Sequence, residues 1–330
     1  MKVRAIAIFN NKGGVGKTTL LCNLAAHLAI HRGRKILVVD ADPQCNSTQN
    51  MFRDETVDRI LTEDTFTIDK IIRPLAQGKG FSTDFTPRRS PTFQVDVIPG
   101  DPRLSLTEDL LATDWVQAVS GSTRGLRTSF VFSNLLEKCS EYEYVFFDMG
   151  PSLGSINRAV LLSSDYFVMP MSIDIFSLRA MDNIAISVKK WNQQLTSGLA
   201  QNDEPDELEV ADPSWHLTFA GYVTQQYTAK RDSSGTRRPV KAFEDLMSEI
   251  PAKIEENFLI DSPLTAEEAN LGTIPTLHSL IPMSQLSRKP IFELKAADGV
   301  VGAHFQKVKE YEEVISGIGK RFLENVGGAA

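Results

Sequence analysis

A glycine-rich segment between two lysines carries the clearest chemistry in this sequence. Its residues are Asn10, Asn11, Lys12, Gly13, Gly14, Val15, Gly16, Lys17, Thr18 and Thr19. The run 3–9, apolar apart from Arg4, comes before it, and leucines and alanines at helical spacing follow it. The segment therefore connects a predicted strand, buried on both faces, to a predicted helix.

A junction of this kind is suited to binding an anion. The backbone N–H groups at a helix start lack intrahelical partners, and the helix dipole places partial positive charge there. Glycines let the chain wrap closely around a phosphate. Lys17 can reach the β- and γ-phosphates of a nucleotide, and the Thr18 hydroxyl can ligate Mg²⁺. The segment therefore predicts a phosphate-binding loop.

Aspartates follow two further apolar runs. The run 35–39 is followed by Asp40 and Asp42, and the run 142–147 is followed by Asp148. In an open α/β sheet, ligands bind beyond the carboxyl ends of the strands, so we expect these carboxylates beside the phosphate loop. Mg²⁺ prefers oxygen ligands and usually keeps several waters. An apolar strand that ends in aspartate is the Walker B pattern, which predicts that Asp148 holds Mg²⁺ through water.

One departure from the plain phosphate loop points to a family. The pattern G-x-x-x-x-G-K-[ST] requires glycine where this chain has Asn11, and a second lysine, Lys12, stands near the loop's start. The string K-G-G-V-G-K-T resembles the deviant Walker A box of the ParA/MinD family of P-loop ATPases, which includes Soj-like proteins. The segments D-A-D-P-Q (40–44) and D-M-G-P-S-L-G (148–154) resemble that family's second box and its switch segment. The resemblance covers most of the chain and is nearest to ParA.

The resemblance implies an ATPase that depends on Mg²⁺. It implies that Lys17 holds phosphate, that Thr18 and Asp148 position Mg²⁺, that Asp40 supports the metal shell, and that Asp42 orients the attacking water. The nucleotide-binding residues it implies are Lys12, Gly13, Gly14, Val15, Gly16, Lys17, Thr18 and Thr19. It also places one of the three residues Gln225 to Tyr227 near the adenine base, without distinguishing among them.

Lys12 has a separate role in the resemblance. It corresponds to the family's signature lysine, which crosses a dimer interface to the partner's nucleotide. We therefore expect a homodimer that forms on ATP and whose catalytic residues are Lys12, Lys17 and Asp42. Turnover is expected to be slow until a ParB-like or other protein partner stimulates it.

The composition excludes several classes of protein. The 330 residues are 42% hydrophobic and 23% charged, with a net charge of −7. These values exclude a disordered chain, a collagen-like fibre and a membrane bundle, and no run of about 18 apolar residues appears. The three cysteines, Cys22, Cys45 and Cys139, form no C-x-x-C pair. We therefore expect neither a zinc site nor a disulfide framework, and we expect a cytoplasmic location.

Strand-like and helix-like stretches alternate along the whole chain. This alternation predicts an α/β fold with a doubly wound, mostly parallel sheet flanked by helices. We expect one domain over residues 1–330, with variable insertions near 50–94 and 200–215. The segment 78–91 is predicted to be a surface loop, and the acidic segment 201–213 a solvated one. No segment precedes the first strand, so we expect no operator-binding helix-turn-helix there.

Two segments are candidates for the surface that ATPases of this class use. Five basic residues suited to phosphate contact lie in a late Gly/Ser-containing segment: Lys230, Arg231, Arg237, Arg238 and Lys241. By analogy with ParA-type proteins they predict non-specific DNA binding and, with it, association with the nucleoid. The last predicted helix, about 303–325, mixes acids and bases on its polar face. We expect that helix to dock on the protein's own core and not on a membrane.

Three functions from different classes remain open. The first is a DNA-partition or cargo-positioning ATPase. The second is a metal-cluster enzyme of the same branch, for which the cysteines are poorly placed. The third is a regulatory switch whose ATP dimer recruits a protein partner, in mobile-element maintenance or defence. A MinD-like membrane-associated ATPase is favoured less. The sequence does not separate the first function from the third.

Overall fold

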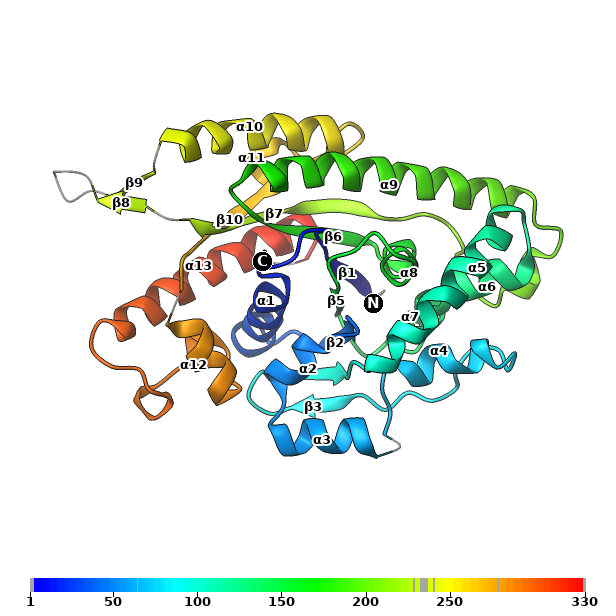
Figure 1. Ribbon diagram of the computed structural model, residues 1–330, viewed down its shortest axis with the longest axis horizontal. Helices are drawn as coiled ribbons and strands as arrows, with labels where there is room; N and C mark the ends of the chain where they lie inside the picture. The colour runs from blue at the N-terminus through cyan, green and yellow to red at the C-terminus, as the bar shows by residue number, and fades with distance from the viewer. Residues whose placement is uncertain are drawn as a thin grey trace.

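Buried apolar runs along the chain form one eight-stranded sheet with helices on both of its faces (Figure 1). The computed structural model describes residues 3–63, 65–227, 229–231, 237–239, 241–277 and 279–328. The strand order in this sheet is β10-β7-β6-β1-β5-β2-β4-β3. Its β3–β4 pair is antiparallel, and the other described pairs within it are parallel. This arrangement confirms the predicted doubly wound, mostly parallel α/β fold.

The strands are short, as is usual in such sheets. Those of the main sheet are β1 (Arg4–Ile8), β2 (Ile36–Ala41), β3 (Arg88–Ser90), β4 (Val95–Ile98), β5 (Tyr144–Met149), β6 (Tyr166–Ser172), β7 (Thr218–Tyr227) and β10 (Asn270–Pro275). Two further strands, β8 (Ala229–Arg231) and β9 (Arg237–Pro239), pair with each other in an antiparallel ladder.

Helices connect most of the parallel strands. They are α1 (Lys17–Arg32), α2 (Asn46–Met51), α3 (Asp54–Thr62), α4 (Asp69–Ala76), α5 (Glu108–Val119), α6 (Thr123–Ser129), α7 (Val131–Glu137), α8 (Ser155–Ser163), α9 (Ile175–Ala200), α10 (Lys241–Phe258), α11 (Ala266–Ala269), α12 (Leu280–Ser287) and α13 (His304–Asn325). Short 3₁₀ turns are η1 (Pro102–Thr107), η2 (Pro205–Leu208), η3 (Ile291–Glu293) and η4 (Ala296–Asp298).

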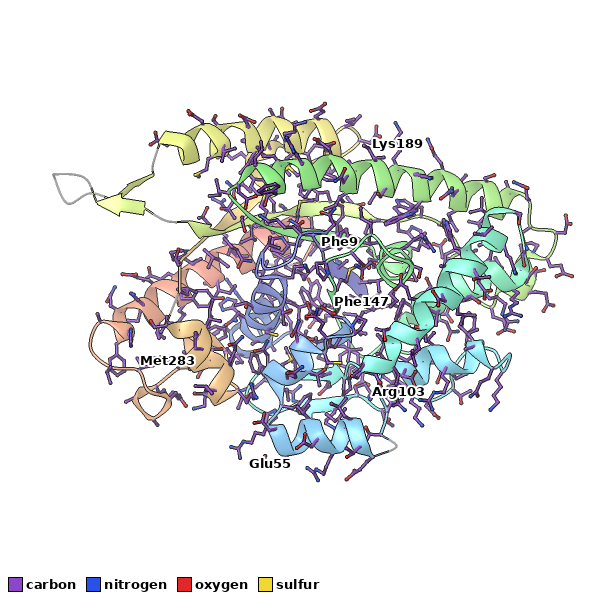
Figure 2. All side chains as sticks on the ribbon, in the orientation of Figure 1. Phe9, Glu55, Arg103, Phe147, Lys189 and Met283 are labelled. Atoms are coloured by element: carbon purple, nitrogen blue, oxygen red, sulfur yellow. The ribbon has the colours of Figure 1, made fainter. Side chains whose placement is uncertain are left out.

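The sheet separates two hydrophobic cores. Successive side chains of a strand point to opposite faces, so in β1 Ala5 and Ala7 join one core while Ile6 and Ile8 join the other. The first core is completed by α5 to α9, and the second by α1 and α13. Figure 2 shows side chains filling the space between these layers. After the half-buried Arg4, β1 is buried on both faces and its residues are all apolar, as the sequence predicted.

Two strands extend further than the sequence predicted. β2 ends at Ala41 and not at 39, and β5 ends at Met149 and not at 147. Asp40 pairs in register with Asp148, so the parallel ladder continues through both aspartates. The carboxylates that were expected just after these strands therefore lie inside them.

Two predicted loops also contain regular structure. Residues 88–90 form β3, which pairs with β4 at the edge of the sheet. The acidic segment 201–213 contains η2, whose Leu208 is buried in the first core. Neither short element has a periodic apolar pattern, so pairing and packing with distant residues decide its structure.

The last helix docks on the protein itself, as predicted. In α13, one face that includes Val308, Tyr311, Ile315 and Phe322 is buried in the second core. No helix among the described residues is long and apolar enough to cross a membrane.

We expect Phe147 to be a large contributor to stability. Its side chain is fully buried in β5 and meets the Phe132 ring edge-on, with 5.6 Å between ring centroids. Phe147→Ala should lower the free energy of unfolding by about 3–5 kcal/mol, because it leaves a cavity in a packed core. Urea unfolding followed by circular dichroism measures the change.

Ile186→Ala is the matched control, since Ile186 lies on α9 with 67% of its surface exposed. That substitution should stay within about 0.5 kcal/mol of the wild type. Equal effects of the two substitutions would contradict the assignment of Phe147 to the core.

Candidate nucleotide-binding site

The loop between β1 and α1 is shaped by its glycines. Gly14 and Gly16 have φ angles of +72° and +76°, which side-chain-bearing residues rarely adopt. A Cβ atom at Gly16 would lie 2.1 Å from the Gln225 Oε1 atom. Gly16 is also the residue before α1, and no side chain caps that helix. The unpaired N–H groups of the first helical turn thus remain for a ligand.

Two cavities flank this loop. The first, of about 350 Å³, is lined by Gly13 to Thr19 together with Asp42, Gln44, Asn46, Asn50, Pro151 and Gln285. The second, of about 480 Å³, is lined by Gly14, Gly16, Thr19, Gln225, Ile274, Pro275, Thr276, Leu277, Ile281 and Tyr311. They share three loop residues and together are large enough for a nucleotide. A further cavity of about 290 Å³, lined by residues such as Val3 and Asp165, lies at the opposite edge of the sheet, away from the loop.

Lys17 lies between the loop and the carboxylates. Its side chain is buried, and its Nζ atom donates a hydrogen bond to the Lys12 carbonyl oxygen at 3.1 Å. Burial lowers the pKa of Lys17, while the negative charges of Asp148 and Asp42 act to raise it. The structure thus gathers one cation and two acids below the phosphate loop.

Asp148 is fully buried, and neither of its carboxylate oxygens has a hydrogen-bond partner. Burial raises its pKa, and the charge of Asp40 adds to the effect, whereas the nearby Thr18 hydroxyl and Lys17 oppose it. Buried charges are normally paired or coordinate a metal. A carboxylate with free oxygens next to a threonine hydroxyl fits the oxygen-rich surroundings of Mg²⁺.

The two aspartates of the second box lie in different surroundings. The Asp40 Oδ2 atom accepts hydrogen bonds from the Thr48 backbone N–H at 2.8 Å and from its hydroxyl at 2.6 Å. Asp42 instead lines the first cavity, and its Oδ1 atom accepts a bond from the Gln44 N–H at 2.9 Å. Asp40 therefore holds the start of α2 in place, and Asp42 faces the site.

Lys12 points toward α9 in its own chain. Its Nζ atom forms an ion pair with Asp174 and lies 3.4 Å from the Ser177 hydroxyl. The same atom lies 5.9 Å from the centre of the Phe176 ring. Its backbone belongs to the loop, but its side chain is held outside the phosphate cavity.

The region expected near the base is partly described. Gln225 lines the second cavity, and its Nε2 atom donates a hydrogen bond to the Gly16 carbonyl oxygen at 3.3 Å. The side chains of residues 226 and 227 lie outside the described set. Among the three candidates, the described geometry thus places Gln225 at the cavity wall.

Several lining residues were not found from the sequence. Asn50 on α2 and Gln285 on α12 line the first cavity, and Tyr311 on α13 lines the second. Each comes from a helix with no recognisable motif, so only its position in space identifies it.

Contacts behind the switch segment were also missed. Asn157 donates hydrogen bonds to the carbonyl oxygens of Gly150 and Ser152 at 2.8 and 2.7 Å. The Ser155 hydroxyl donates to the Glu108 Oε1 atom at 2.7 Å. The first turns of α5 and α8 therefore hold the segment that follows Asp148.

The side chains of the predicted DNA patch fall outside the described set. The backbones of β8 and β9 extend away from the body of the molecule (Figure 1). The side chains concerned, Lys230, Arg231, Arg237, Arg238 and Lys241, are not among those that the structure describes.

Cys22, Cys45 and Cys139 are free thiols, and all three are buried. Within the described part of the chain, no group of three or more histidine, cysteine, aspartate or glutamate residues is placed to hold a metal ion.

A glycine loop after the central strand β1, a buried aspartate at the end of the neighbouring strand β5 and a parallel sheet define a P-loop nucleoside triphosphatase. Residues 3–201 match the AAA domain family known as AAA_31. Together with the deviant loop sequence and the relatives below, this match shows that the chain belongs to the ParA/MinD-like family of P-loop ATPases.

Individual relatives agree with this assignment. The sporulation initiation inhibitor protein Soj of Bacillus subtilis is 29% identical over 201 residues, covering 59% of this chain and 69% of Soj. The crystal structure of DIP2308 from Corynebacterium diphtheriae is 30% identical, with a TM-score of 0.72 over 98% of this chain and 99% of that one. The Cyanothece McdA–ATP complex has a TM-score of 0.64 over 100% of this chain and 98% of that one. At 15% identity it supports the fold alone.

We expect Asp148→Asn to stabilise the protein when nucleotide and metal are absent. Because burial raises the pKa of Asp148, the folded state binds its proton more tightly than the unfolded chain does. Stability is therefore lost as the pH rises above the ordinary carboxyl pKa. The variant should be more stable than the wild type by about 1–3 kcal/mol near pH 8, and the difference should vanish near pH 4. Urea unfolding over this pH range measures it.

Asp182→Asn is the control, because Asp182 forms a surface ion pair with Lys253 at 3.0 Å. It should change stability by less than about 1 kcal/mol. An Asp148→Asn protein no more stable than wild type at high pH would show that the Asp148 charge is compensated within the chain.

Proposed function

We propose that this protein is a ParA-like ATPase that binds ATP with Mg²⁺, forms a sandwich dimer and hydrolyses ATP slowly until a partner stimulates it. The observation that carries the proposal is the partnerless Asp148 carboxylate, buried below the loop beside Lys17 and Thr18. Membership of the family supports it, and the McdA structure that shares the fold is an ATP complex.

Each residue near the loop has a proposed role. The N–H groups of Gly13 to Thr19 and the Lys17 ammonium bind the phosphates. Thr18 and Asp148 hold Mg²⁺, which when bound neutralises charge on the β- and γ-phosphates. Asp40, which accepts a hydrogen bond from the Thr48 hydroxyl, supports the set of Mg²⁺ ligands. The Asp42 carboxylate orients the attacking water, as its position on the cavity wall allows.

Lys12 completes the site across the dimer. We propose that its ammonium reaches the nucleotide of the partner subunit and stabilises the charge that develops during hydrolysis, as an arginine finger does. Nucleotide then acts as a timer for the lifetime of the dimer. In this proposal the dimer binds DNA non-specifically through the basic residues around β8 and β9, which would place the protein on the nucleoid. A ParB-like or other protein triggers its release.

Asp42→Ala and Lys12→Ala should separate dimerisation from hydrolysis. Asp42→Ala should bind ATP and accumulate as a dimer, while hydrolysis falls at least about 100-fold, because water is no longer oriented. Lys12→Ala should bind ATP yet remain monomeric and inactive. Light scattering with ATP and Mg²⁺, together with phosphate release, measures both properties.

A monomeric Asp42→Ala protein that still binds ATP would contradict the proposed dimer, and so would an active, dimeric Lys12→Ala protein. Binding of a fluorescent ATP analogue to each variant shows whether the loop itself is intact.

The DNA surface is tested by the double substitution Arg237→Ala/Arg238→Ala. It should weaken ATP-dependent binding to random-sequence DNA. The slope of log affinity against log salt should fall by about 4, because each of the two subunits in the dimer loses about two phosphate contacts. Arg88 and Arg89 on β3 are the weaker candidate for DNA contact, so Arg88→Ala/Arg89→Ala is the comparison and should lower the slope less than the first double substitution does. Fluorescence anisotropy at several salt concentrations measures the slope.

Unchanged DNA binding in the Arg237→Ala/Arg238→Ala protein would remove this patch from the proposal. No DNA binding by the wild-type ATP dimer would favour the regulatory switch that recruits a protein. The trapped Asp42→Ala dimer is then the bait for a pull-down of that partner.

A further inference from the structure

The first turn of α9 holds the side chain of Lys12. Asp174 is the residue before α9, and its two carboxylate oxygens have different partners. Its Oδ1 atom accepts a hydrogen bond from the Ser177 N–H at 2.9 Å and so caps the helix, while its Oδ2 atom forms the ion pair with Lys12. The cap and the ion pair are therefore separable: a neutral side chain of the same shape keeps the first and loses the second.

Among the described residues, the contacts around the Lys12 ammonium come from this one turn. Besides Asp174 they are the Ser177 hydroxyl at 3.4 Å and the face of the Phe176 ring at 5.9 Å. Burial acts to raise the pKa of Asp174, but the hydrogen bonds from Lys12 and Ser177 outweigh it, so the pKa lies below its usual value. Asp174 is thus ionised at neutral pH and attracts Lys12.

The backbone holds Lys12 near this turn. The Asn10 Nδ2 atom donates a hydrogen bond to the Pro170 carbonyl oxygen at 2.9 Å, and the Asn10 Oδ1 atom accepts one from the Lys12 N–H, also at 2.9 Å. Asn10 is fully buried, so these two bonds fix the start of the loop against β6. Because α9 begins just after β6, Lys12 and Asp174 are kept close by the same strand end.

We propose that Asp174 is a positioning residue that holds Lys12 in its own chain and thereby opposes formation of the ATP dimer. The inference rests on the proposed function, in which Lys12 must reach the partner's nucleotide. The Lys12 ammonium cannot keep its ion pair with Asp174 while it binds a phosphate in the partner subunit. The ion pair is therefore broken when two subunits join, and its strength lowers the dimer affinity.

The exposure of the pair sets the size of the effect. The side chains of Lys12 and Asp174 are 27% and 35% exposed, so solvent and salt screen their attraction. Ion pairs this accessible contribute modestly, so removing the charge of Asp174 should tighten the ATP dimer by about two- to fivefold. Added salt should weaken the Lys12–Asp174 ion pair in the wild type. A variant without the charge of Asp174 has no such ion pair, so salt should not have this effect on it.

The test compares Asp174→Asn with Asp182→Asn in the full-length chain. Asparagine at 174 retains an oxygen to cap α9 but carries no charge. Asp182 lies on the same helix and pairs with Lys253 at 3.0 Å, away from the loop, so its variant controls for loss of an ion pair on α9. Sedimentation velocity with Mg²⁺ and a slowly hydrolysed ATP analogue gives the dimer dissociation constant at low and at moderate salt. Fluorescent-nucleotide binding measures the monomer separately.

We expect Asp174→Asn to dimerise two- to fivefold more tightly than wild type at low salt, and we expect the two proteins to converge as salt rises. Asp182→Asn should match the wild type, and nucleotide affinity of the monomers should be equal. A dimer constant for Asp174→Asn equal to or weaker than that of wild type would overturn the inference, and so would an equal gain in Asp182→Asn. A wild-type protein that binds nucleotide but never dimerises would instead overturn the proposed function.

Discussion

The Asp148 carboxyl, buried at the centre of the sheet without a hydrogen-bond partner, is the constraint around which the site is organised. Removing a carboxylate from water costs several kcal/mol unless another charge or a metal compensates it. Lys17 compensates part of this cost, but its own burial favours loss of its proton. Asp42 and Asp40 add further negative charge nearby. The folded chain thus holds an electrostatically incomplete site, which gives a physical reason for it to bind a cation and an anion together.

The order of the strands creates this concentration of charge. β1 lies between β5 and β6 and its partner β5 lies next to β2, so the loop and both aspartate-bearing strands end at one edge. The ladder continues through Asp40 and Asp148, which makes both carboxylates part of the sheet. Thr48 then satisfies Asp40, while Asp42, two residues further, emerges into the cavity. Two similar residues acquire different surroundings because one lies within the strand and the other beyond its end.

The loop is also held against β6, which neighbours β1 on the side away from β5. Asn10 connects it to the end of β6, and Lys12 connects it to the first turn of α9. On the other side, Asn157 and Glu108 hold the segment after Asp148. Nucleotide phosphates bound at the loop would lie between these two supports, so the proposed dimerisation can depend on groups that do not themselves line the cavity.

The local pattern of residues was sufficient to predict the phosphate loop, the strands that lead to the aspartates and the final amphipathic helix. Each of these depends on interactions between near neighbours: glycine freedom, apolar periodicity and helix-end chemistry. Other features were not predictable, because they depend on residues far apart in the chain. The ladder that carries β2 and β5 through their aspartates, the pairing of residues 88–90 with β4 and the burial of Leu208 all need a distant partner. The same holds for the contact of Lys12 with Asp174, which lies 162 residues away and becomes a neighbour only when β6 is placed beside β1.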